Sequence, residues 1–449
     1  MTARVMYSQK IRHYNHIFRA TVDAYRAAVD FFISICMEEW ENISGQGSSK
    51  ARMNLVEAMT HPTSKRPAVR YCFDTCDKRF YKFPSYLRRA ACMEAIGKVS
   101  TYKTCLTLRE ASGGGKRPGP PRAGAAYPCL YRGNMYQEGE GHSAQIKVYI
   151  RNTWDWISVS LRKSDADYVK RHCSSMKQSS PTLVKRGKEW FLDFLYESNV
   201  SLTSKPVSEQ AVLAVDLGIN NSCTCTCLMS DGTVVGRRFL RLPAEEDCLK
   251  KAVGRIKKAQ QHGNRKTPRL WAAARGINDH IAVKTAAFII ETAVYFHADV
   301  IVFEHLDRTG KKRGSEKQRL HMWKTAYVQA MAESRAHRAG MRVSRVCAWN
   351  TSRLAFDGSG RVKRGKESGH TGGNYSICEF ATGKLYNCDL NASYNIGARY
   401  FIREMIKSLP EKERLALEAK VPEAARRSTC TLSTLISLHA VSAAEAACC

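Results

Sequence analysis

Two short apolar runs, each ending in an acidic residue, constrain this chain most. Residues 211–215 lead into Asp216, and residues 300–303 lead into Glu304. A continuous apolar run bounded by polar residues and glycine predicts a strand buried on both faces. A carboxylate at the end of such a strand is costly unless another charge compensates it. We therefore expect Asp216 and Glu304 to have partners in the folded protein.

The residues after Asp216 predict a hairpin. Cysteines alternate with threonines over residues 223–227, which is the period of a strand. Asp231-Gly232 is a turn signal before a third strand at residues 233–239. A hairpin sheet that carries one carboxylate on its first strand resembles the start of an RNase H-like nuclease.

A third acid, Asp389, lies at the start of a predicted helix. Acids on three separate elements become neighbours only through folding, and carboxylates packed closely repel one another unless cations intervene. Mg²⁺ prefers oxygen ligands and keeps several waters. We therefore expect two Mg²⁺ ions at Asp216, Glu304 and Asp389, where they could bind the attacking and leaving oxygens of a phosphodiester.

The order and wording of these segments resemble a known family. Residues 216–220 read Asp-Leu-Gly-Ile-Asn, 303–306 read Phe-Glu-His-Leu, and 389–396 read Asp-Leu-Asn-Ala-Ser-Tyr-Asn-Ile. These are similar to the three split motifs of a RuvC-type nuclease domain, as in TnpB proteins of bacterial transposons and compact type V CRISPR effector nucleases. The resemblance covers most of the chain, weakly in its first half. It implies that the three acids are the catalytic metal ligands.

The resemblance also implies the activity of an RNA-guided DNA endonuclease, a metal-dependent hydrolase with one RuvC site. Its partners would be a guide RNA and double-stranded target DNA, recognised next to a short DNA motif. Two alternatives stay open: a guide-free RNase H-like nuclease, such as a resolvase or transposon accessory enzyme, and an RNA-guided binder without cleavage. The source of the guide, the DNA motif and the oligomeric state also stay open.

The charge of the chain indicates a polyanionic partner. Its 71 Lys and Arg against 41 Asp and Glu give a formal net charge of +30. A basic run can be only a solvated face, but beside a nuclease centre it favours contact with phosphates. The candidate nucleic-acid-binding residues are Lys250, Lys251, Arg255, Lys257, Lys258, Arg265, Lys266, Arg269, Lys311, Lys312, Arg313, Arg361, Lys363, Arg364 and Lys366.

The segment before Asp389 departs from the family pattern. Many relatives carry a zinc ribbon there, with two Cys-x-x-Cys pairs, whereas this chain has only Cys347, Cys378 and Cys388, without a short-spaced pair. That spacing argues against zinc. Arg353 lies close enough to the motif to be a further active-site candidate.

No apolar run reaches the ~18–20 residues that a membrane span needs, and the start of the chain lacks the pattern of a signal peptide. We expect a bacterial cytoplasmic protein, associated with the nucleoid through DNA and without membrane contact. Its 17 cysteines are scattered, and in a reducing compartment most should be free thiols.

The predicted fold class is a multidomain α/β and β protein, in which the hydrophobic period changes from helical to two over residues 127–200. The resemblance implies an RNase H-like (RuvC) nuclease domain, an N-terminal helical recognition domain and a small wedge β-barrel. The expected parts are a helical recognition domain (1–115, with a possible first wedge strand at 1–8), a wedge β-barrel (116–205), the first RuvC part (206–342), an inserted nucleic-acid-loading segment (343–388), the second RuvC part (389–425) and a disordered tail (426–449).

Overall fold

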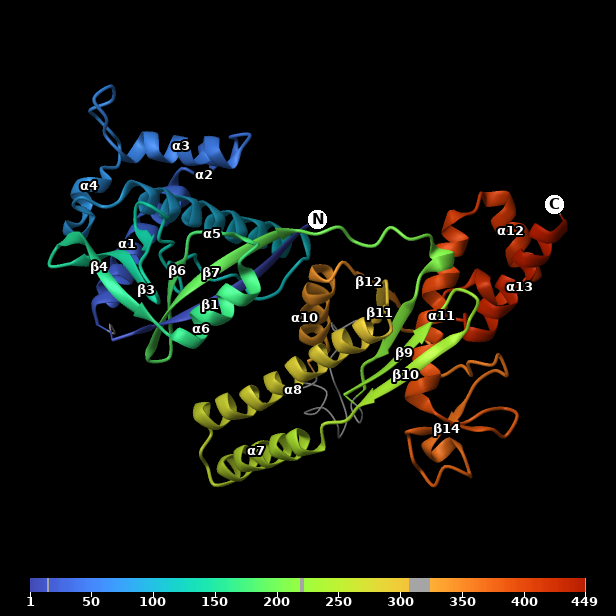
Figure 1. Cartoon of the computed structure of the whole chain (residues 1–449). Coiled ribbons are helices and arrows are strands. Elements are labelled where there is room, and N and C mark those ends of the chain that lie inside the picture. Colours follow the sequence, from blue (N-terminus) through green and yellow to red (C-terminus); the bar gives the residue numbers. More distant parts are fainter. Residues whose placement is uncertain (14–15, 219–221, 307–323, 449) are drawn as a thin grey trace. The chain divides into compact units, whose positions relative to one another are not determined.

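A computed structural model describes residues 1–13, 16–218, 222–306 and 324–448. The chain divides into two compact units, Thr2–Ser198 and Asn199–Cys449, the second of which also includes Met1. Both mix helices with sheets (Figure 1), which agrees with the predicted α/β and β class.

The unit Thr2–Ser198 is built on a seven-stranded sheet. Its strands are β1 (Thr2–Arg12), β2 (Tyr136–Glu138), β3 (Ser143–Ile150), β4 (Thr153–Leu161), β5 (Lys177–Gln178), β6 (Thr182–Arg186) and β7 (Glu189–Asn199). The order is β2-β3-β4-β1-β7-β5, and β6 also pairs with β7. Cys129 bridges to Thr182 of β6 and Arg132 to Tyr136 of β2, so one short segment links the two ends of the sheet.

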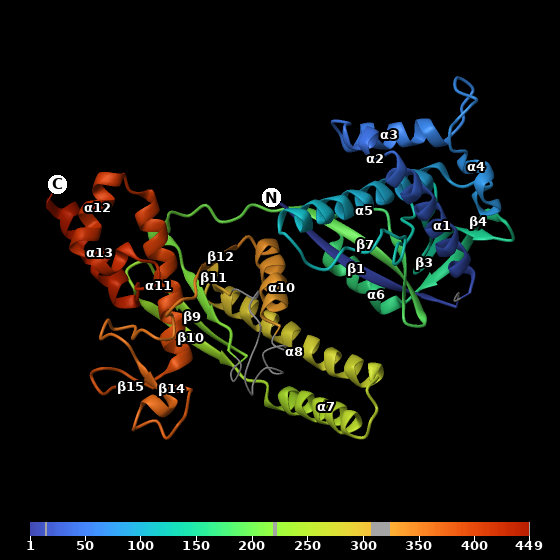
Figure 2. The same ribbon diagram turned by 180° about the vertical axis from the view of Figure 1, so that it is seen from behind.

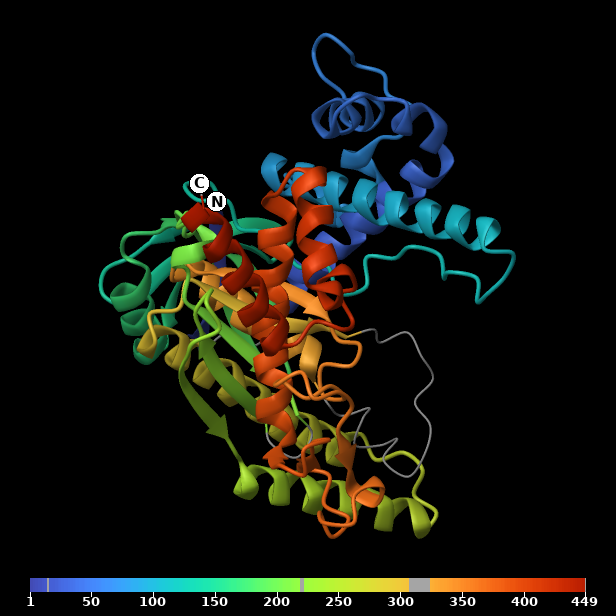
Figure 3. The same cartoon turned by 90° about the vertical axis from the view of Figure 1, so that its right-hand side faces the viewer.

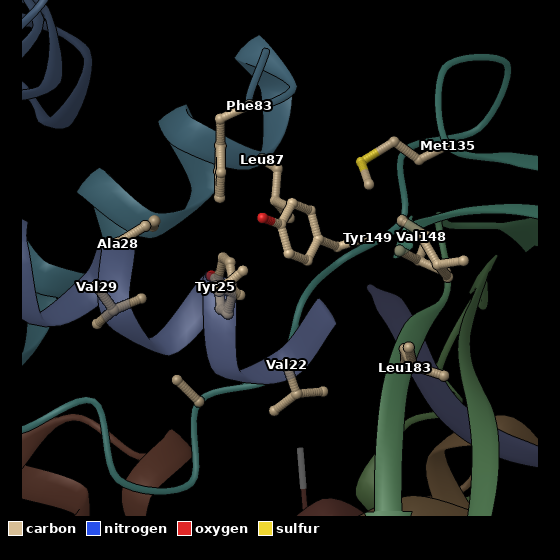
Figure 4. Close-up of a cluster of buried hydrophobic side chains, with 14 of the residues drawn as sticks. Val22, Tyr25, Ala28, Val29, Phe83, Leu87, Met135, Val148, Tyr149 and Leu183 are labelled. Carbon is tan, nitrogen blue, oxygen red and sulfur yellow. The ribbon is translucent and has the colours of Figure 1, made fainter. Parts of the chain in front are cut away.

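Helices inserted between β1 and β2 share a core with this sheet. They are α1 (Ile17–Glu38), α2 (Trp40–Ser44), α3 (Ser49–Thr60), α4 (Phe73–Cys76), η1 (Lys78–Phe80) and α5 (Ser85–Ala111), and α6 (Lys163–Cys173) follows β4. Figure 4 shows Tyr25 of α1 and Leu87 of α5 in one cluster with Val148 of β3. Trp154 and Trp190 are buried in this core.

The predicted boundary between the first strand and the first helix is wrong by several residues. The first strand extends to Arg12 instead of residue 8, because Ile11 and Arg12 pair with Leu161 and Ser160 of β4. The first helix follows at Ile17. This boundary depends on pairing with a strand far along the chain, and the local hydrophobic period does not predict such pairing.

The unit Asn199–Cys449 contains a five-stranded sheet with helices on both faces (Figure 2). Its elements are η2 (Val207–Glu209), β8 (Val212–Asp216), β9 (Cys223–Leu228), β10 (Val234–Leu240), α7 (Pro243–Gln261), α8 (Pro268–Tyr295), β11 (Val300–His305), α10 (Thr325–Arg338), β12 (Arg342–Cys347), β13 (Lys363–Arg364), η3 (Gly365–Glu367), β14 (Ile377–Glu379), β15 (Leu385–Asn387), α11 (Cys388–Ser408), α12 (Glu411–Lys420), η4 (Pro422–Ala425) and α13 (Leu432–Cys448).

The strand order is β10-β9-β8-β11-β12. Strands β8, β9 and β10 form the predicted antiparallel hairpins, whereas β8, β11 and β12 run parallel to one another. One face packs on α11 and α13, and the other on α8 and α10. Burial on both faces explains why β8 and β11 are continuous apolar runs instead of alternating ones.

Helix α11 lies close against the sheet because of one glycine. A Cβ atom on Gly397 would lie 2.6 Å from Leu228 Cδ1 and 3.2 Å from Ala214 Cβ. Figure 3 shows the inserted segment at the N-terminal end of α11. Helices α12 and α13 lie near the C-terminal half of α11 in the same view. That segment contains a three-stranded sheet in the order β13-β14-β15.

The expectation of a disordered tail from residue 426 is wrong for the described residues. Residues 432–448 form α13, whose Leu432, Leu435 and Leu438 are buried with α11. The segment is rich in small and polar residues, but these leucines recur at helical spacing and bury one face. The prediction of disorder relied on the overall composition of the segment and overlooked the spacing of these leucines.

Candidate active site

Two parallel strands place Asp216 and Glu304 side by side. In the pairing of β8 with β11, Val215 lies opposite Phe303, and each acid is the next residue of its strand. Neighbouring strands are about 4.8 Å apart, and residues at one level point to the same face. Ala214 and Val302 belong to the core beneath α11, so Asp216 and Glu304, two residues further on, face α11 as well.

The first turn of α11 supplies Asp389. The helix begins here because Asn387 accepts hydrogen bonds on its Oδ1 from the backbone N–H groups of Asp389 and Leu390, both at 3.0 Å. Asp216, Glu304 and Asp389 are each half-buried. The structure thus gathers the three predicted acids at one end of the sheet, where Glu304 and Asp389 both act electrostatically on Asp216.

Burial and like charge penalise ionisation at this site. Burial raises the pKa of Asp216 well above its ordinary value, and Glu304 and Asp389 raise it further, whereas Arg364 lowers it. Burial also raises the pKa of Glu304, while a hydrogen bond from Thr351 and the charge of Arg399 lower it. Ionising the whole group at neutral pH therefore calls for additional positive charge.

The three acids supply carboxylate oxygens, which are the ligands that a hard divalent cation prefers. A bound cation would also offset the repulsion between the carboxylates. In the described residues, however, no three His, Cys, Asp or Glu side chains are arranged to hold a metal ion. Within this group, Glu304 Oε1 accepts a hydrogen bond from Thr351 Oγ1. The three acids fit Mg²⁺ by chemistry without forming a finished coordination site.

A polar stripe of α11 fixes the segment that carries Thr351. Asn391, Asn395, Arg399 and Arg403 recur every fourth residue and so share one side of the helix. Their backbone acceptors are, in order, Leu354 O (2.8 Å), Thr351 O (2.9 Å), Cys347 O (2.7 Å) and Arg345 O (2.9 Å). Successive stripe residues hold successively earlier parts of the segment, which places Thr351 beside Glu304.

Thr351 and Arg399 were missed in the sequence. Arg399 is buried and also donates to the carbonyls of Trp349, Cys430 and Ser428 at 2.8, 3.0 and 3.1 Å. The spacing of four between polar residues along this helix was a signal for Arg399. Nothing in the local sequence marks Thr351, because its partner lies on another strand.

The structure places Arg353 and Arg364 differently from each other. Arg353, the further active-site candidate, pairs with Glu367 at 3.2 Å, and no contact with the three acids is seen in the described residues. Arg364, predicted to bind nucleic acid, lies on β13, where it hydrogen-bonds Cys388 and acts on Asp216. The inserted segment thus brings one cation to the acids.

The remaining candidates are the other predicted nucleic-acid-binding residues and the three cysteines. Lys250, Lys251, Arg255, Lys257, Lys258, Arg265, Lys266 and Arg269 are exposed on α7, the following turn and α8, and Arg361, Lys363 and Lys366 are exposed on the inserted segment. Lys311, Lys312 and Arg313 lie outside the described residues. Cys378 and Cys388 are buried and hydrogen-bonded to each other, whereas Cys347 ends β12, where its carbonyl binds Arg399.

None of the helices in the described ranges is both long and apolar enough to span a membrane.

Comparisons with known proteins support the fold. The profile of the Aq_aa04 family matches residues 5–150, and no curated protein matches in sequence. A Cas12f1–sgRNA–target DNA complex is 12% identical with a TM-score of 0.54, over 85% of this chain and 82% of that one. An AacC2c1–sgRNA binary complex is 10% identical with a TM-score of 0.43, over 84% and 65%.

The likeness to Cas12f1 shows that this chain has the fold of the compact type V CRISPR effectors. The resemblance inferred from the three motifs is therefore confirmed at the level of the fold.

Proposed function

We propose that this protein is an RNA-guided DNA endonuclease that hydrolyses phosphodiesters at Asp216, Glu304 and Asp389. The observation that carries the proposal is the convergence of these acids on one end of a sheet, in a chain with the fold of Cas12f1. The Cas12f1 structure is a complex with sgRNA and target DNA, and the net charge of +30 suits such partners.

Divalent cations held by Asp216, Glu304 and Asp389 would offset the negative charge that develops on the phosphate in the transition state. The chain's own groups have distinct roles. Thr351 orients Glu304 through its hydrogen bond, and Arg364 adds positive charge beside Asp216.

We further propose the division of labour that the family resemblance implies. Residues 1–115 would contact the guide–target duplex, 116–205 the RNA scaffold, and 343–388 the DNA strand entering the site. The exposed basic residues of α7 and α8 would contact phosphates.

The test compares cleavage and binding in the full chain with its co-purified RNA. We expect Asp216→Ala to lower plasmid cleavage by about 10²–10³-fold or more and to leave DNA binding intact. Cleavage without any bound RNA would favour a guide-free nuclease. Binding without cleavage by the wild-type protein, at any Mg²⁺ concentration, would favour a guided binder and overturn the hydrolytic proposal.

A further inference from the structure

A cavity of about 1240 Å³ opens in the unit Asn199–Cys449 beside the candidate active site. Its walls come from the end of β12, the C-terminal half of α11, α12 and η4. Figures 1 and 2 label β12, α11 and α12. His305, the residue after Glu304, is part of its lining. The cavity thus reaches the residue after Glu304 but does not include the three acids.

Two cations at this cavity are available to a ligand, and a third lies near carboxylates. Lys407 and Arg427 line it, are exposed, and have no ion pair within the described part of the chain. Arg414 lies 3.7 Å from Glu411 and 4.0 Å from Glu418, and its Nε is buried without a hydrogen-bond partner among the described residues. A buried donor without a partner is costly, so an anion that reaches it would bind favourably.

An exposed aromatic ring lies at the same cavity. Trp349 is 72% exposed although it lines the cavity. Its carbonyl accepts a hydrogen bond from Arg399 at 2.8 Å, so the backbone is fixed while the ring stays accessible. Ile402 and Ile406 of α11 provide an apolar wall. An open indole beside an apolar wall suits the face of an unpaired base.

We infer that this cavity binds a nucleotide of a single strand, with the base against Trp349 and the phosphate at Lys407, Arg414 and Arg427. The aromatic ring and the apolar wall suit the base of a nucleotide, and the cations suit its phosphate. The strand must be single because a base has to be unpaired to stack on a side chain. The inference rests on the proposed function in that the bound strand would be the one that reaches the carboxylates.

The first test is photocrosslinking of the full chain to single-stranded oligonucleotides that carry 5-iodouracil. DNA and RNA oligonucleotides of the same sequence show whether the bound nucleotide belongs to a DNA strand or to an RNA strand. We expect the crosslinked peptide from at least one of them to contain Trp349. Crosslinks that form only elsewhere in the chain would overturn the inference.

The second test measures affinity for the same oligonucleotides. We expect Trp349→Ala to weaken binding by about 5- to 100-fold, with partial rescue by Trp349→Phe, since stacking on an aromatic ring is worth that much. Lys407→Glu with Arg427→Glu should weaken binding by about tenfold or more.

The matched control is Lys412→Glu with Arg426→Glu. These residues are exposed near the same cavity but do not line it, and the change in net charge is the same. Equal losses in both double variants, or no loss in Trp349→Ala, would overturn the site. A chelator keeps nuclease activity out of these measurements, so failure of the site and failure of the cleavage proposal are told apart.

Discussion

At the scale of residues, the two acids on the central strands are held differently. Glu304 has a hydrogen-bond donor in Thr351 and the buried charge of Arg399 nearby, whereas burial and two carboxylates dominate the surroundings of Asp216. Burial and like charge therefore make ionisation of Asp216 costly in the folded protein.

This cost predicts a stabilising substitution. Because the pKa of Asp216 is raised in the folded state, ionisation at neutral pH destabilises the fold, and the penalty disappears as pH falls below the unfolded pKa. We expect Asp216→Asn to raise the melting temperature of the metal-free protein by roughly 2–4 °C at pH 7 and to have no such effect near pH 3. Lower stability of the variant at pH 7 would contradict this account. Mg²⁺ should stabilise the wild type more than the variant.

The hydrogen bond from Thr351 predicts a change in the pH profile. It lowers the pKa of Glu304, so Thr351→Val should move the acid limb of the cleavage rate to higher pH and reduce the rate at neutral pH by about tenfold. Thr351→Ser keeps the hydroxyl and should restore both. The same profile in all three proteins would show that Thr351 is only a packing residue.

At the scale of elements, α11 organises the site. It supplies Asp389, carries the polar stripe that fixes residues 344–356, and packs against β8 and β9. Its distance from the sheet therefore controls the position of one acid relative to the other two.

The close approach of α11 predicts opposite effects at two helical glycines. A Cβ on Gly397 would meet Leu228 and Ala214, whereas one on Gly254 of α7 would have nothing within 4 Å. We expect Gly397→Ala to lower the free energy of unfolding by about 1–3 kcal/mol, and Gly254→Ala to raise it by roughly 0.5–1 kcal/mol. Chemical denaturation measures both, and equal effects would contradict the packing argument.

Helix α13 also belongs to this core. Removing residues 432–449 takes away Leu432, Leu435 and Leu438, each buried and worth about 1.5–3 kcal/mol. Their sum is comparable to the whole stability of a typical domain, so this unit should fail to fold. A chain that ends at Ala443 keeps all three leucines and should give the near-ultraviolet circular dichroism of the full protein.

At the scale of the whole molecule, the net charge of +30 should dominate the proposed binding to nucleic acid. We predict that replacing Lys250, Lys251, Lys257 and Lys258 by Gln reduces the slope of log affinity for DNA against log salt by up to ~0.9 for each phosphate that the protein no longer neutralises. The same four lysines changed to Arg keep the charge and should keep the slope. An unchanged slope in the Gln variant would mean that this basic surface is only solvated.

The sequence by itself determined the local features of this protein. Two apolar runs fixed the central strands and put an acid at the end of each, and the polar cap Asn387 fixed the start of α11, with Asp389 in its first turn. The motifs around these acids also predicted the type V effector fold. These features depend on short-range periodicity and capping, which neighbouring residues specify.

Only the tertiary structure decided what surrounds these acids. The register of β8 with β11, the bond from Thr351 to Glu304 and the approach of Arg364 each join residues far apart in the chain. The pairing that extends β1 and the burial of α13 were misjudged for the same reason. Such contacts form because distant surfaces must bury apolar area and satisfy polar groups together, and no local pattern records which partner each residue finds.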